Sequence, residues 1–246
     1  MSNQKEWEHN FGLVEGKQGA IIGKMFGVLV VKTQKNEIGY LAAFSGKLAG
    51  GFHHSKFVPP VFDSLTENSF LNKGMEELTR INKEIKKTES IERIAELQEL
   101  RRKNSVALQD KLFNQYYFLN QIGEEKSLRE IFKTFLNIPP PLNKTQHTAL
   151  TESKSSLLRT QKGTNKSDNS QYTNPPSGAG ECAAPKLLQY AFQNKMKPLA
   201  IAEFWWGLSP KSESWKHGHF YPACKEKCEP ILAHMLEGVE MDEVLE

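Results

Sequence analysis

The sequence lacks any apolar run long enough to cross a bilayer. Its first ten residues, MSNQKEWEHN, also lack the basic and then apolar layout of a signal peptide. Together these two absences favour a cytoplasmic protein that has no membrane partner.

Cysteine is scarce, with three residues in a chain of 246: Cys182, Cys224 and Cys228. An odd number of cysteines in a chain of this length argues against a disulfide scaffold and for reduced thiols that are packed, metal-bound or reactive. A marked charge imbalance is missing as well, because 32 lysine and arginine residues face 29 aspartate and glutamate residues, for a net charge of +3. Such a slightly basic chain permits nucleic acid as a partner without requiring it.

What the chain does contain is enough apolar residues, 38%, to build the core of one large domain or two small ones. The segments 25–31 and 38–44 are apolar at successive positions and are joined by a polar turn at 32–37. This pattern predicts a β hairpin whose strands are covered on both faces. We assign residues 1–63 to the first part of an α/β domain, which contains this hairpin.

The pattern changes to a helical one from residue 68 to about residue 121. Charged residues separate two apolar stripes there, and Thr88 is a predicted cap between two helices. We therefore expect residues 64–142 to form a long helical hairpin inserted in the α/β domain. Such a hairpin is typical of a spacer or of an arm through which a chain forms homo-oligomers. Residues 143–173 are too polar to bury themselves and predict a flexible linker.

The second part of the predicted α/β domain covers residues 174–246. Its pattern predicts a helix at 183–196, an apolar strand at 197–207 and an amphipathic helix after Cys228. A turn with two cysteines, HGHFYPACKEKC, separates the strand from the last helix.

A turn of small residues, SGAG, comes directly before the predicted helix at 183–196. Backbone N–H groups of such a turn can cradle a phosphate, so Ser177, Gly178 and Gly180 are candidate contacts for phosphate or RNA. The alternative is that small residues here only allow the chain to turn tightly.

The order of hairpin, helix, strand, cysteine turn and helix resembles the zinc-dependent cytidine deaminase fold. In that superfamily one helix starts with a His or Cys, one further residue and a Glu, and a second helix starts with PCxxC. The thiolates or imidazoles bind zinc and the Glu shuttles protons. The resemblance implies a layered sheet with helices, a catalytic Glu181, and Cys224 and Cys228 as zinc ligands.

Two departures shift the expected zinc site. Alanine stands two residues before the glutamate, where deaminases have their first ligand, and the second motif is CxxxC. Because residues four apart share one helix face, Cys224 and Cys228 are still expected to approach one ion. Cys182, with His217 or His219, would complete a tetrahedron. The alternative is that the three cysteines are buried, reduced and metal-free, since free cysteine is among the most buried residue types.

Six phrases are similar to the amino-terminal region of long-form RluA-family RNA pseudouridine synthases: GKMFGVLVV, GYLAAFSG, FVPPVFD, PPSGAGECAAPKLLQYA, LAIAEFWWG and HGHFYPACKEKCEPIL. In that family this region precedes the synthase domain. The family's catalytic phrase, HRLD followed by a Thr-Ser-Gly turn, is missing here. The resemblance therefore implies an RNA-modification-associated accessory module that is not a synthase by itself, with RNA and a separate pseudouridine synthase as partners.

Two other functions remain open at this point. One is a zinc-dependent, deaminase-like enzyme that acts on nucleosides or RNA. The other is a helical oligomerisation protein that depends on residues 64–136.

Overall fold

The computed structural model describes residues 23–66, 69–137, 174–209 and 214–241. The predicted linker at 143–173 lies outside these described residues. Among the described helices, none combines the length and the apolar character that a membrane crossing requires.

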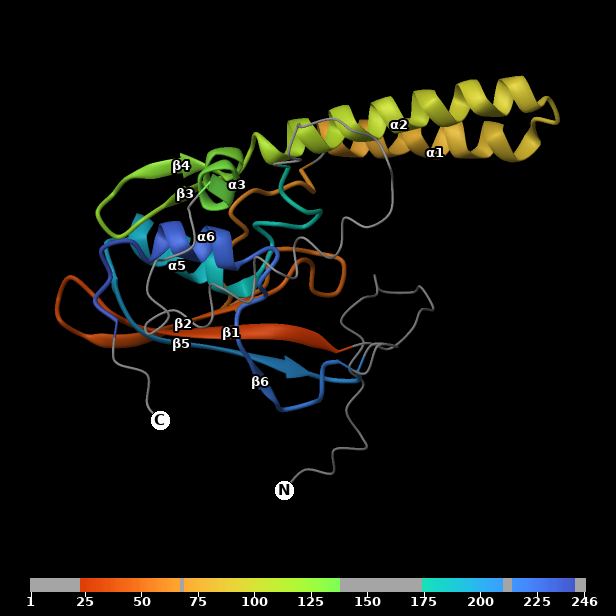
Figure 1. The fold of residues 1–246 in the computed structure, drawn as a ribbon. Helices are drawn as coiled ribbons and strands as arrows, with labels where there is room; N and C mark the ends of the chain where they lie inside the picture. Colours follow the sequence, from red (N-terminus) through yellow and green to blue (C-terminus); the bar gives the residue numbers. More distant parts are fainter. Residues whose placement is uncertain (1–22, 67–68, 138–173, 210–213, 242–246) are drawn as a thin grey trace.

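The described residues form a mixed α/β fold built on one four-stranded antiparallel sheet (Figure 1). The order of the strands in the sheet is β2-β1-β5-β6, and every neighbouring pair is antiparallel. The strands that the sequence predicts at 25–31, 38–44 and 197–207 are all present. The strands are β1 (Lys24–Lys32), β2 (Ile38–Phe44), β5 (Lys197–Trp206) and β6 (Phe220–Tyr221).

Helices α5 (Ala183–Gln193) and α6 (Glu229–Met235) cover one face of the sheet (Figure 1). The helix α5 lies very close to β1, because a Cβ atom added at Gly27 would be 3.0 Å from the Ala183 side chain. Alternate residues of β1 face the helices, and Leu29, for example, is 1% exposed. The core begins between the sheet and α5, and it continues on the other side of α5 and α6, where residues such as Phe118 and Leu128 belong to the same cluster.

The other face of the sheet carries no helix in the described part of the chain (Figure 1), although the Phe57 ring packs on Phe26 with ring centroids 5.9 Å apart. Tyr40 is 74% exposed and Phe220 is 71% exposed, whereas we expected both faces of the hairpin to be covered. That expectation is wrong because apolar residues at successive positions also occur where one face carries exposed aromatic side chains. The rings of Phe26 and Phe204 stack with centroids 6.1 Å apart, and Phe204 contacts Phe220 at 5.9 Å.

Two long helices, α1 (Phe70–Lys87) and α2 (Ile91–Phe113), pack along each other and extend away from the sheet (Figure 1). The Ser69 side chain accepts the Asn72 N–H at the start of α1, and Ser90 begins α2 in the same way. Thr88, the predicted cap, is the C-cap of α1.

The helical pattern ends earlier than predicted, because α2 stops at Phe113 rather than near residue 121. A short hairpin follows, and it was missed because its strands have only three residues each. Gly123, with φ of +88°, allows the tight turn of this hairpin. The new elements are β3 (Tyr117–Leu119), β4 (Glu125–Ser127) and α3 (Leu128–Asn137). They form a layer on the far side of α5 and α6 from the sheet (Figure 1).

Candidate metal centre

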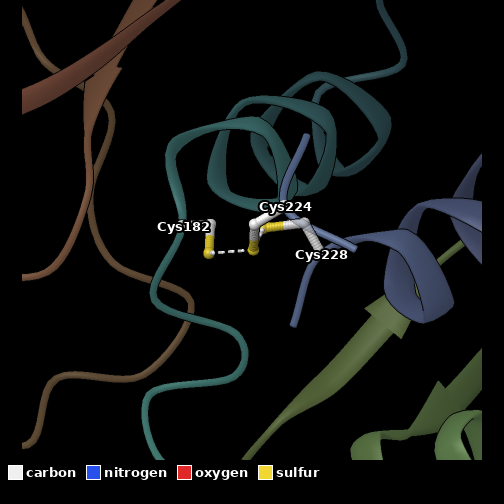
Figure 2. A group of neighbouring side chains, drawn as sticks. All are labelled: Cys182, Cys224 and Cys228. Atoms are coloured by element: carbon white, nitrogen blue, oxygen red, sulfur yellow. Dashed lines mark hydrogen bonds between the residues drawn. The ribbon is translucent and has the colours of Figure 1, made fainter. Parts of the chain in front are cut away.

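The three cysteines come together between the starts of α5 and α6 (Figure 2). Cys182 is the N-cap residue of α5, and Cys228 is the N-cap residue of α6. Cys224 lies in the turn before α6, where its carbonyl oxygen accepts the Cys228 N–H at 3.0 Å and the Glu229 N–H at 3.1 Å. The two cysteines of the CxxxC motif thus lie in a turn rather than on one helix face, but the turn brings their side chains together.

The spacing of the sulfur atoms fits a single metal ion. The Sγ atoms of Cys182 and Cys224 are 4.0 Å apart, and those of Cys224 and Cys228 are 3.2 Å apart. All three Sγ atoms lie within 4.8 Å of one another. Tetrahedral zinc with Zn–S bonds of about 2.3 Å places its sulfur ligands about 3.8 Å apart. The donor set of three thiols is therefore suited to zinc with little movement.

The three thiols have very different tendencies to ionise. Hydrogen bonding with Cys182, and then with Cys228, holds the pKa of Cys224 well below its usual range. Hydrogen bonding with Cys224 raises the pKa of Cys182, and hydrogen bonding with Cys182, and then with Cys224, raises the pKa of Cys228. One thiolate is thus ready to bind a cation, and a bound cation would favour ionisation of the other two.

A buried carboxylate, Glu203, adjoins this cysteine cluster. Glu203 is 9% exposed on β5, and its Oε1 accepts the N–H of Ala184 at 3.1 Å. Burial raises the pKa of Glu203 to about 7, against a smaller opposing effect of the Ala184 bond, and the charge of Cys224 raises it further. Ala184 stands two residues after Cys182, so this carboxylate lies over the first turn of the helix that Cys182 begins.

Glu181, the predicted catalytic residue, has a different set of partners. Its carboxylate accepts a hydrogen bond from the Tyr116 hydroxyl, and it interacts electrostatically with Lys24 and Lys186. Lys186 is 3% exposed, and its Nζ donates to two backbone carbonyl oxygens of the β2 end and the following turn, at 3.0 and 3.1 Å. Burial lowers the pKa of Lys186 to about 8, while Glu181 raises it. These contacts connect Glu181 to Tyr116, which directly precedes β3, and through Lys186 to the end of β2.

The predicted histidine ligand does not join the three cysteines. The Nδ1 atom of His217 accepts the Gly207 N–H at 2.9 Å, and its ring packs on Trp206 with centroids 4.3 Å apart. Among the described residues, the possible ligands that come together at this centre are the three cysteines. The structure thus offers three protein ligands at this centre.

The SGAG turn before α5 is tight, as its sequence predicts. Gly178 and Gly180 both have positive φ, of +78° and +90°. The Ala179 N–H donates to the Pro176 carbonyl, and the Glu181 N–H donates to the Gly178 carbonyl. These two N–H groups serve the turn itself, and the phosphate contact at Ser177, Gly178 and Gly180 stays a prediction.

A second group of possible ligands, Glu124, His234 and Glu237, lies between the β3–β4 hairpin and the end of α6. The Nζ atom of Lys126 is 3.2 Å from Glu124 and 3.9 Å from Glu237. A lysine therefore already supplies the positive charge that these carboxylates attract.

Comparisons with protein-family models, with curated proteins and with solved structures found no match for this chain.

Glu203 is the residue of this centre that the sequence reasoning missed. A signal for it was present, because Glu203 is the one charged residue in the apolar stretch LAIAEFWW. A carboxylate in the middle of a predicted buried strand is costly to bury unless it has a partner or a function.

Proposed function

We propose that Cys182, Cys224 and Cys228 bind one zinc ion and that this centre carries hydrolytic chemistry of the deaminase type. The observation that supports the proposal is the convergence of the three sulfur atoms, all within 4.8 Å, from two helix starts. Zinc sites with three protein ligands and one open position are typical of catalysis, whereas closed sites with four protein ligands are structural.

The chemistry divides between the ion and the side chains. Zinc held by thiolates supplies a Lewis acid that activates water. The Glu203 carboxyl, with its pKa near 7, suits the transfer of a proton to or from a reacting group at neutral pH. Its bond to the Ala184 N–H holds it beside the first ligand of the centre. We therefore favour Glu203 over Glu181 as the carboxylate that serves this site.

Ammonia release from cytidine, adenosine and guanosine tests the enzymatic part of the proposal. We expect release from at least one of them with the zinc-loaded protein and a loss of about a hundredfold or more in Glu203→Gln. Glu181→Gln should lose less activity than Glu203→Gln, since Glu181 is bound to Tyr116. Release that does not depend on zinc, or a larger loss in Glu181→Gln, would contradict this assignment.

A second function is supported by the open face of the sheet. We propose that this face binds single-stranded RNA, as the accessory module of an RNA modification system acting beside a separate pseudouridine synthase. The supporting observation is the two exposed aromatic side chains of this face, Tyr40 at 74% and Phe220 at 71%, together with the ring contacts that continue from Phe220 through Phe204 to Phe26. Sheets that present aromatic rings stack on RNA bases, and each stacked base contributes about 1–3 kcal/mol.

Fluorescence anisotropy with a labelled uridine-rich RNA tests this second function. The double variant Tyr40→Ala and Phe220→Ala should weaken binding about tenfold or more, because it removes two stacking surfaces. Ile122→Ala is the matched control, since Ile122 is 70% exposed but lies in the β3–β4 turn. Equal binding by all three proteins would count against an RNA surface on the sheet.

A further inference from the structure

A pocket of about 250 Å³ lies between β5, α5 and α6. Its walls are largely apolar and include Leu188 of α5, Ile201 of β5, and Leu232 and Leu236 at the end of α6. A volume of this size accommodates a compact body of one or two rings. The apolar walls favour a ligand with little polarity on its faces.

Glu203 carries the only carboxyl group in the described lining of this pocket, and no lysine or arginine of the described residues lines it. One carboxylate oxygen, Oε1, already accepts the Ala184 N–H. A carboxylate has about four acceptor positions, so it can take further N–H donors from a ligand. A ligand with a negative charge would be repelled, and the low exposure of Glu203 strengthens that repulsion.

The pocket adjoins the cysteine centre through its own wall. Ala223 lines the pocket and is bonded to Cys224, while Ala184 lines the pocket and follows Cys182 by two residues. Glu203 also interacts electrostatically with both Cys182 and Cys224. A ligand that reaches Glu203 is therefore brought to the edge of the proposed metal site.

We infer that this pocket is where the cysteine centre receives its substrate, and that it takes a compact planar ligand that presents N–H donors and carries no negative charge. This inference rests on the proposed function where it links the pocket to the metal. The preference among ligands depends on Glu203 and the apolar walls alone, so it is testable without zinc.

Three probes of nearly equal shape test the inference: benzamidine, benzamide and benzoate. Their dissociation constants for the full chain are measured by ligand-observed NMR, first with reduced, chelator-treated protein at pH 8, where the Glu203 carboxyl, with its pKa of about 7, is ionised. We expect benzamidine and benzamide to bind, and benzoate to bind about tenfold more weakly or not at all. Glu203→Gln should reduce the preference for benzamidine over benzoate by about tenfold, because it removes the charge and keeps the shape.

A second pair of variants locates the binding. Ile201→Trp places a large side chain at the pocket, where Ile201 is 44% exposed, and should abolish binding of benzamide. Ile38→Trp is the matched control on β2, since Ile38 is 64% exposed outside the pocket lining. Equal affinity for the three probes, a preference that survives Glu203→Gln, or binding that survives Ile201→Trp with a folded circular dichroism spectrum would each overturn the inference.

Zinc loading then tests the link to the centre. Because the pocket wall includes the neighbours of two ligands, bound zinc should change the benzamide dissociation constant by about threefold or more. An unchanged constant in protein shown to contain zinc would overturn the link. Protein that takes up no zinc but keeps the probe preference would instead overturn the proposed metal centre and support the pocket as a ligand site.

Discussion

Replacing Cys224 and Cys228 by serine should abolish zinc binding. The two side chains provide two of the three sulfur atoms within 4.8 Å of one another, and a hydroxyl is a far weaker ligand for zinc than a thiolate. We expect zinc affinity to fall by about a thousandfold or more. At a free zinc concentration about 1,000 times the dissociation constant, zinc should stabilise the unmodified chain by about 4 kcal/mol, and the double variant should show no such gain.

Zinc titration against a chromophoric chelator and thermal unfolding with and without zinc measure these two effects. His217→Gln is the control, because His217 bonds to Gly207 and lies outside the cysteine group, so this variant should keep the zinc of the unmodified chain. Zinc retained by the double serine variant would show that the ion binds elsewhere.

Glu203→Gln should make the metal-free protein more stable at pH 8 and should have little effect at pH 4. The pKa of Glu203 is raised from 4.5 to about 7 in the fold, chiefly by burial. Below pH 4.5 the carboxyl is protonated in both the folded and unfolded chains, so no penalty arises. As pH rises from about 4.5 to about 7 the unfolded chain ionises first, and the free energy of unfolding falls by up to about 3 kcal/mol.

Glutamine removes this ionisation and retains an oxygen that can accept the Ala184 N–H. The difference in free energy of unfolding between the two proteins should therefore grow between pH 4.5 and 7 and stay constant above that range. Urea denaturation at a series of pH values, with a chelator present, measures it. A difference that is the same at pH 4 and pH 8 would show that Glu203 ionises as an exposed glutamate does.

Much of the candidate site was predictable because its parts are local in sequence. Cys182 stands at the start of an apolar helix pattern and Cys228 stands before an amphipathic one, so the sequence already places both cysteines at helix starts. The hairpin of β1 and β2 was predictable for a similar reason, since two apolar runs flank a short polar turn.

The parts that could not be predicted depend on contacts between distant segments. Glu203 gains its role from the Ala184 N–H, nineteen residues earlier in the chain, and from the nearby cysteines at the starts of α5 and α6. Tyr116 was read as part of a helical region, yet it is 2% exposed and bonds to Glu181, which lies 65 residues further on. The sequence also did not show whether the second face of β1 is covered, because the spacing of apolar residues does not reveal which elements pack on a strand.

The most direct test of the three-cysteine zinc centre is an X-ray absorption spectrum of the zinc-loaded, untagged protein at the zinc edge. We expect three sulfur ligands at about 2.3 Å and one oxygen or nitrogen ligand at about 2.0 Å. That first shell would identify Cys182, Cys224 and Cys228 as the ligands of one ion, since the chain has three cysteines. A first shell without sulfur, or protein that retains no zinc after loading under reducing conditions, would contradict the proposed centre.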